Sequence, residues 1–309
     1  MSGPNNKLKA IAYILAAIAF ATSQDAIVKS LQGGYSTWEA VAFRGAFAIP
    51  PFLAWGYFAR LQFLTVPPVW RLMLLRSIIL FSAYMAFALA IATIPLANAV
   101  AIYFTMPFFV GSLSGIALGE KVPAYRWFAI VIGFGGVLVS VRPGSETVSA
   151  AALLALYSAL GYALGQLLSR KISQSADPII IANMQTVLYL VGSLSIGAVV
   201  SVFHIDASSS AGFAALTKPF VWPAAKDLGM MGLMGLLSCV SSVFFVRAYQ
   251  AAPANFVAPL EYSAMIFAVI YGIAWFNDYP DFYTLMGAGI VIAAGLFMVT
   301  MDRKYQTTG

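Results

Sequence analysis

Four charged residues of this 309-residue chain lie inside apolar stretches, where a charge is costly: Asp25, Arg44, Arg247 and Glu261. A charge near the centre of a membrane helix costs at least about 2.5 to 3.5 kcal/mol unless it is paired or faces water. Helix rise places Asp25 and Arg44 near one membrane face, and Arg247 and Glu261 near the other. Each pair is predicted to act as a gate or to hold one end of a zwitterion. Structural ion pairs that only fix helix packing are the alternative.

Uncharged polar and aromatic side chains in the same stretches suit recognition of a small organic molecule. A site for an amino acid needs apolar and aromatic walls with a few polar groups for its charged ends. Helix packing or hydrogen bonding between helices is the alternative use of such groups. The candidate substrate-binding residues are Gln24, Tyr84, Tyr103, Tyr162, Gln166 and Tyr262. Lys29, Lys171 and Arg76 lie at helix ends and are interpreted as anchors that extend to the membrane surface.

The elements that carry these residues are apolar segments long enough to span a membrane. Hydrophobic residues make up 61% of the chain and charged residues 9%, and the mean hydropathy is +0.87. Soluble domains carry roughly 25% charged residues, so this composition excludes a soluble globular protein. Because a bilayer core needs about 20 apolar residues per helix, the sequence predicts an all-α polytopic membrane protein. Its ten transmembrane helices are predicted at 8–30, 38–59, 70–93, 97–118, 123–141, 148–171, 178–202, 228–251, 255–276 and 282–301.

The distribution of Lys and Arg predicts the orientation of these helices. With the N-terminus in the cytoplasm, eleven basic residues fall on the cytoplasmic side and four on the other. Short cytoplasmic loops carry such an excess, so both termini are predicted to be cytoplasmic. The net charge of +6 is then explained by topology and by anionic lipid. Nucleic acid is therefore not expected as a partner.

The second half of the chain repeats the pattern of the first. A shift of 157 residues places Ala97-Asn98 on Ala254-Asn255 and Pro123 on Pro280. The predicted halves are residues 1–147 and 148–309, each with five spans. Since five is odd, the second half enters the membrane from the opposite side. Inverted repeats of this kind are common in carriers that work by alternating access, which predicts a transporter.

Two runs of residues carry a resemblance to a known family. The run 97–107, ANAVAIYFTMP, is followed by Leu118-Gly119-Glu120-Lys121, and its second copy at 253–262 reads PANFVAPLEY. This pattern resembles the EamA module of the drug/metabolite transporter superfamily, and it is most similar to the YddG-type exporters of aromatic amino acids. The second copy departs from the pattern at Asn277, where the first has Glu120. The resemblance implies ten helices around a central cavity and export of a small metabolite across a bacterial inner membrane.

Other function classes find less support in the residues. The chain has no G-x4-G-K-[ST] loop for ATP and no H-E-x-x-H motif, and its single histidine and single cysteine suit neither a proton relay nor a metal site. No cofactor, metal or catalytic residue is therefore expected, and the partners are a small-molecule substrate and lipid, with a monomer plausible. A proton-coupled multidrug exporter that uses Asp25 or Glu261 stays open. A channel and an intramembrane enzyme are the alternatives from other classes.

Overall fold

The computed structural model describes residues 4–58, 68–106, 108–109, 113, 124–141, 150–172, 176–203, 211–251 and 258–306. All regular structure in these ranges is helical, which confirms the predicted fold class. Most of the helices coincide with predicted spans. Of the predicted span 97–118 the structure describes α4 and residues 104–106, 108, 109 and 113, and the remainder lies outside the described residues. The short α9 lies between the predicted spans 178–202 and 228–251. The helices are α1 (Pro4–Leu31), α2 (Thr37–Phe58), α3 (Trp70–Ile91), α4 (Leu96–Tyr103), α6 (Ala124–Val141), α7 (Ala150–Ile172), α8 (Pro178–Phe203), α9 (Ala211–Thr217), α10 (Ala225–Ala251), the 3-10 helix η1 (Ala258–Ser263), α12 (Ala264–Phe276) and α13 (Phe282–Gln306).

Five of the described helical segments are long and apolar enough to cross a membrane: Leu8–Leu31, Trp70–Ile91, Ala150–Ser169, Ile179–Phe203 and Ala225–Phe245. Their outward faces are apolar as well. In α8, for example, Val187, Val191 and Leu194 are 40 to 54% exposed. Apolar side chains gain nothing from facing water, whereas lipid covers them at no cost. The protein is therefore a polytopic membrane protein.

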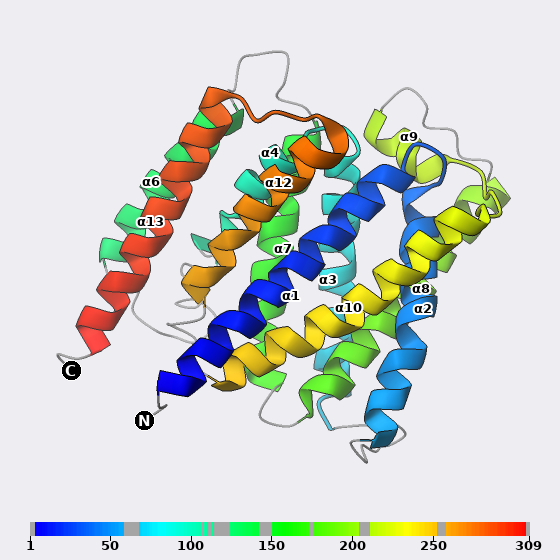
Figure 1. Ribbon diagram of the computed structural model, residues 1–309, viewed down its shortest axis with the longest axis horizontal. Coiled ribbons are helices and arrows are strands. Elements are labelled where there is room, and N and C mark those ends of the chain that lie inside the picture. The colour runs from blue at the N-terminus through cyan, green and yellow to red at the C-terminus, as the bar shows by residue number, and fades with distance from the viewer. Residues whose placement is uncertain are drawn as a thin grey trace.

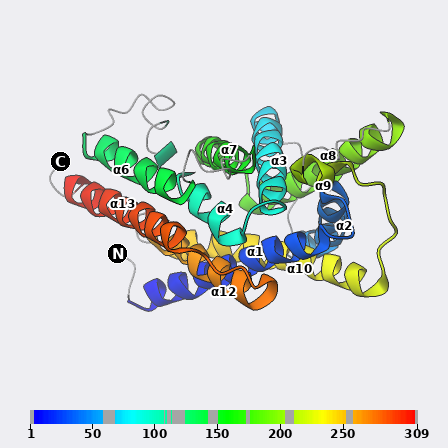
Figure 2. The ribbon, with the colours of Figure 1, turned by 90° about the horizontal axis from the view of Figure 1, so that it is seen from above.

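The helices pack in a pattern in which each half repeats the other. In the first half α1 packs along α10 of the second, and in the same way α7 of the second half packs along α3 of the first. The pairs α2–α8 and α6–α13 join helices that the predicted repeat makes equivalent. Figure 2 shows the resulting layers, with α6, α7 and α3 along one side and α13, α12, α1 and α10 along the other. Both halves therefore contribute helices to the interior.

Both chain termini lie at one end of the bundle, which is called the terminal end here (Figure 1). The opposite end, called the distal end, holds the connection from α1 to α2 and the connection from α12 to α13. In the first connection the Ser36 hydroxyl accepts a hydrogen bond from the Glu39 N–H at 3.2 Å and so caps α2. In the second, Asn277 has a left-handed φ of 53°, and the Asp278 N–H donates to the Gly272 carbonyl at 2.9 Å. Asparagine adopts this conformation more readily than most residues, which explains why asparagine stands at position 277, where the first copy of the repeat has Glu120.

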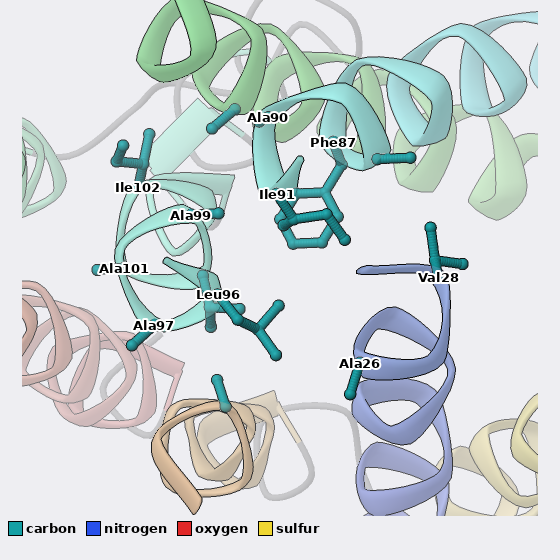
Figure 3. Close-up of a cluster of buried hydrophobic side chains, with 14 of the residues drawn as sticks. Ala26, Val28, Phe87, Ala90, Ile91, Leu96, Ala97, Ala99, Ala101 and Ile102 are labelled. Atoms are coloured by element: carbon teal, nitrogen blue, oxygen red, sulfur yellow. The ribbon is translucent and has the colours of Figure 1, made fainter. Parts of the chain in front are cut away.

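A large apolar cluster joins α1, α3 and α4. Val28 of α1, Phe87 and Ile91 of α3 and Leu96 of α4 belong to it, and all four are buried. Figure 3 shows Phe87 and Ile91 close to Leu96, with Val28 across from them. Burial of a Leu, Ile, Val or Phe side chain contributes about 1.5 to 3 kcal/mol. The cluster therefore fixes the distal parts of these three helices relative to one another.

Glycine allows two further helix pairs to approach closely. A Cβ atom on Gly235 of α10 would lie 2.6 Å from the Phe47 Cβ and 2.8 Å from the Phe47 carbonyl carbon in α2. A Cβ on Gly136 of α6 would lie 2.8 Å from the Gly287 oxygen of α13. Small residues bring helix backbones together in this way in membranes, so these positions set the α2–α10 and α6–α13 distances.

Candidate functional site

The first pair of predicted charges, Asp25 of α1 and Arg44 of α2, lies inside the bundle. The two half-buried side chains interact electrostatically, although no direct salt bridge joins them in the part of the chain that is described. The Arg44 guanidinium instead lies 4.3 Å from the Tyr84 ring centroid and 5.3 Å from that of Tyr189. A desolvated cation over an aromatic face gains about 2 kcal/mol. The two tyrosine rings thus hold a half-buried cation that no carboxylate among the described residues pairs with directly.

Four tyrosines form a cluster beside this cation, and they come from helices in both parts of the sequence. Tyr84 of α3 and Tyr189 of α8 have ring centroids 5.5 Å apart, and Tyr103 of α4 and Tyr162 of α7 meet edge to face at 5.4 Å. Tyr162 also interacts electrostatically with Asp25 and Arg44. The structure therefore brings together three of the predicted tyrosines, Tyr84, Tyr103 and Tyr162, beside the predicted charge pair.

Tyr189 belongs to this cluster but was not among the predicted site residues. It is 3% exposed, and its hydroxyl donates to the Leu80 carbonyl at 2.9 Å and accepts from the Gln185 amide at 3.2 Å. Gln185 and Tyr189 stand four residues apart and so share one helix face. That spacing of an amide and a phenol within an apolar span was the signal available in the sequence.

The second pair of predicted charges is placed in two different environments. Glu261 of η1 is half-buried and interacts electrostatically with Tyr103 and Tyr162, so it belongs to the tyrosine cluster. Arg247 of α10 is exposed, and its guanidinium lies 5.2 Å from the Trp55 ring and 6.0 Å from the Tyr13 ring. The contacts described for Arg247 are thus aromatic ones at the terminal part of α1 and α2.

The remaining candidates are amides and one further tyrosine. Gln24 is buried next to Asp25, and its amide nitrogen donates to the Phe20 carbonyl of its own helix at 3.3 Å. The backbone of Gln166 belongs to α7 and that of Tyr262 to η1. The side chains of Gln166 and Tyr262 lie outside the described part of the structure, so both remain predictions.

Arg76 of α3 was interpreted as a membrane-surface anchor, and the structure corrects this interpretation. Its Nε donates to the Ser169 hydroxyl of α7 at 2.6 Å, and its Nη1 donates to the side-chain amide oxygen Oε1 of Gln185 in α8 at 2.9 Å. The side chain therefore points between three helices rather than toward lipid. Through Gln185 it is connected to Tyr189 and hence to the cluster around Arg44.

Polar contacts at the distal end join the end of α1 and the α1–α2 connection to the later part of the chain. Lys29, at the end of α1, was interpreted only as a membrane-surface anchor, but it takes part in these contacts. Its ammonium pairs with the Asp278 carboxylate at 2.6 Å. Tyr35 donates to Asp227 at 2.7 Å, and this hydrogen bond raises the pKa of Tyr35. The Lys218 ammonium donates to the Gln32 and Gly33 carbonyls. These contacts of Lys29, Tyr35, Lys218, Asp227 and Asp278 are called the distal clamp.

Comparison with known proteins matches the chain to one family twice. The EamA-like transporter family matches residues 8–142 and again residues 149–301. A solved structure titled "Crystal structure of protein" covers 98% of this chain, with 99% of its own chain covered, at a TM-score of 0.64 and 14% identity. At that identity the likeness shows the fold alone.

Three curated relatives carry different substrates in their names. An S-adenosylmethionine uptake transporter of Rickettsia conorii is 24% identical over 96% of this chain and 94% of its own. A riboflavin transporter of Rhizobium johnstonii is 30% identical over 71% of this chain and 67% of its own. The pseudopaline exporter CntI of Pseudomonas aeruginosa is 27% identical over 66% of each chain. These names do not single out the aromatic amino acid exporters to which the sequence showed most resemblance.

Proposed function

This chain belongs to the EamA-like transporter family, and from that premise we propose that it is a secondary transporter that moves a small organic metabolite by alternating access. The observation that carries the proposal is the cluster of Arg44, Asp25, Tyr84, Tyr103 and Tyr162 inside the bundle. It combines both signs of charge with aromatic faces, and its members come from helices of both halves.

The cluster favours a substrate that has a charged end and an aromatic or heteroaromatic ring. Edge-to-face packing against a tyrosine contributes about 0.5 to 1.5 kcal/mol beyond the burial of the ring. Asp25 and Arg44 offer opposite charges to the ammonium and carboxylate of a zwitterion. Aromatic amino acids have this chemistry and are the first substrates proposed.

The relatives' substrates extend the same chemistry to other molecules. S-adenosylmethionine joins an amino-acid group to a purine ring, and riboflavin carries a fused aromatic ring system. Both are therefore second choices for this chain, whereas an unrelated apolar drug would leave the charges of Asp25 and Arg44 unused. The names of the relatives include uptake as well as export, so export by this chain is part of the proposal and not of the comparison.

Placement in the membrane is proposed on the same grounds. The excess of Lys and Arg on the side of the termini supports a bacterial inner membrane protein with both termini in the cytoplasm. The terminal end would then face the cytoplasm and the distal clamp the opposite side. Helices from both of the proposed halves, 1–147 and 148–309, contribute residues to the cluster within one chain, which supports a monomer as the transporting unit.

Transport by proteoliposomes tests the proposal. Purified protein is reconstituted and tested for uptake of labelled Trp, Phe, Tyr, S-adenosylmethionine and riboflavin, with and without a proton gradient. We expect saturable movement of at least one substrate, which falls at least about tenfold in Arg44→Gln because a hydrogen bond to a charged group is worth about 1.5 to 3 kcal/mol. Arg71→Gln is the matched control, since Arg71 is exposed at the start of α3 and contacts Trp70.

The outcome decides between classes of function. Saturable movement without a gradient supports a facilitator, and movement only with a proton gradient supports a proton-coupled exporter. An unsaturable, voltage-dependent current would support a channel. Absence of saturable transport for the whole panel under every gradient would refute the proposed substrate class.

A further inference from the structure

Arg76 is a cation inside the bundle for which the described residues provide no acidic partner. It is the seventh residue of α3, so helix rise places it about 9 Å from the start of that span. Its contacts are the Ser169 hydroxyl and the Gln185 amide oxygen, both uncharged. Among the described residues the ion pair is Lys29–Asp278, which lies at the distal end and far from Arg76. An unneutralised charge at this depth requires an explanation.

The two described hydrogen bonds leave most of the guanidinium available. Arginine carries five N–H donors in a planar fork, and Ser169 and Gln185 accept from one of them each. These contacts hold Nε and one side of Nη1, so the orientation of the fork is fixed from α7 and α8. A fixed fork with free donors is the arrangement that binds a carboxylate or phosphate through two parallel hydrogen bonds.

The polar contacts of Arg76 continue into the tyrosine cluster. Gln185 donates to the Tyr189 hydroxyl at 3.2 Å, and the Tyr189 ring lies 5.3 Å from the Arg44 guanidinium. Arg76 also interacts electrostatically with Tyr162. Since Arg76 and Tyr84 are eight residues apart on α3, their Cα atoms are separated by about 12 Å along the helix. Arg44, which lies over Tyr84, and Arg76 thus lie at different depths along α3, with Arg76 nearer the terminal end.

We propose that Arg76 binds the anionic oxygen group of the transported metabolite, a carboxylate in the first place, on the side of the tyrosine cluster that faces the terminal end. The proposal rests on the proposed transport function and names the chemical group that the substrate carries. Arg44 receives the same group on the distal side. The substrate's aromatic ring remains among the tyrosines while its anion passes from one arginine to the other.

A purely structural role for Arg76, in which it only ties α3 to α7 and α8, makes a different prediction. In that case its loss weakens all substrates alike, because the geometry of the whole site changes. A binding role weakens only substrates that carry the anion. The discrimination between matched charged and uncharged probes therefore separates the two roles.

Binding to the purified full-length protein in nanodiscs tests the proposal with two matched pairs of probes. The first pair is L-tryptophan and L-tryptophanamide, which differ in the carboxylate. The second is riboflavin 5′-phosphate and riboflavin, which differ in the phosphate. We expect Arg76→Gln to lower affinity for the anionic member of a bound pair by about 10- to 100-fold, the value of a charge-assisted hydrogen bond, and to change the uncharged member less than about threefold.

Two further variants complete the experiment. Arg76→Lys keeps the charge but not the fork and is expected to retain part of the discrimination, whereas Arg71→Gln removes an exposed charge of the same helix and is expected to change nothing. If Arg76→Gln weakens only the binding of L-tryptophan relative to L-tryptophanamide, the anionic group that Arg76 binds is a carboxylate. If it weakens only riboflavin 5′-phosphate relative to riboflavin, that group is a phosphate.

The inference fails if wild-type protein binds both members of each pair equally, or if Arg76→Gln weakens both members alike. Transport of these probes would survive that result, so the proposed function would stand without it. If wild-type protein neither binds nor transports any of the four probes, the proposed substrate class is refuted. The proposed role of Arg76 is then refuted as well, because it depends on that substrate class.

Discussion

The pair Lys29–Asp278 of the distal clamp is expected to hold the distal end closed, and its removal should open that end. Lys29 stands at the end of α1, and Asp278 follows α12 in the connection to α13. Alternating access requires the two halves to separate at one end while they close at the other. A contact that joins the halves at the distal end exists only when that end is closed, so its free energy biases the equilibrium between the two states.

The structure sets the size of this bias. The Lys29 Nζ and Asp278 Oδ2 are 2.6 Å apart, and the two side chains are 16% and 29% exposed. Fully exposed pairs contribute about 0.2 to 1 kcal/mol, and this pair is mostly buried. The ammonium also lies 4.8 Å from the Phe276 ring, worth about 0.5 to 1 kcal/mol. A total of about 1 to 2 kcal/mol corresponds to a shift of about 5- to 30-fold in the equilibrium.

A distance measurement across the distal end reads this shift. In a Cys239→Ser background, which removes the only cysteine, spin labels are attached at Ser30→Cys and Tyr279→Cys, both exposed positions next to the pair. Lys29→Met is expected to increase the population of long distances by about 5- to 30-fold.

Two comparisons decide whether the pair is responsible. The exchange Lys29→Asp with Asp278→Lys should restore short distances, because it rebuilds the ion pair with its ends reversed. Lys9→Met, at the exposed terminal part of the same helix, should leave the distribution unchanged. A distribution in Lys29→Met that is identical to that of the parent would refute the assignment of this pair as a latch.

Two further perturbations test the packing and the clamp. Gly235→Ala is expected to lower the thermal unfolding temperature in detergent, because the new methyl group meets the Phe47 backbone and overpacking costs about 1 to 3 kcal/mol. Gly229→Ala, in the same helix but with open space around it, should leave that temperature unchanged or raised; equal effects would contradict the packing argument. Tyr35→Phe removes the donor to Asp227 and should open the distal end as Lys29→Met does. That hydrogen bond raises the pKa of Tyr35 above its ordinary value of about 10. The bond is therefore present at neutral pH and is lost only as the pH rises through the raised pKa. A distal end that opens between pH 6 and 8 in a way that depends on Tyr35 would contradict this.

The helices could be predicted from the sequence because membrane length and apolar composition dictate them. The predicted span 70–93 is α3 at Trp70–Ile91, and the predicted 178–202 is α8 at Pro178–Phe203. The short helix α9 could not be predicted in this way. Its seven residues are too few to span a membrane, so hydropathy gives no signal for it. Asn277 is an intermediate case, since its departure from the repeat was visible but its left-handed backbone was not.

The site could be predicted only in part, because hydropathy says which residues lie in a span but not which way they point. Asp25 and Arg44, which were paired because charges are rare at that depth, interact electrostatically, but Arg44 lies over the Tyr84 ring and forms no direct ion pair with Asp25 among the described residues. Arg76 and Arg247 show the limit of that reasoning. Arg76, which looked like an anchor, points between helices, and Arg247, which looked like a gate, is exposed. Packing between the helices decides which face of each helix points to the interior, and hydropathy along the sequence does not reveal that face.

The inverted repeat also implies that the two end states of the transporter differ in energy. The packing of the helices is the same when the two halves are interchanged, since the α1–α10 contact corresponds to the α7–α3 contact. The charged residues do not correspond in this way. At the shift that aligns Gln24 with Gln166, Asp25 corresponds to the buried apolar Leu167. A symmetric rocking motion therefore carries an asymmetric set of charges. In the proposed scheme Arg76 supplies a cation nearer the terminal end and Arg44 supplies one beside Tyr84, so the substrate's anion meets a cation at both depths.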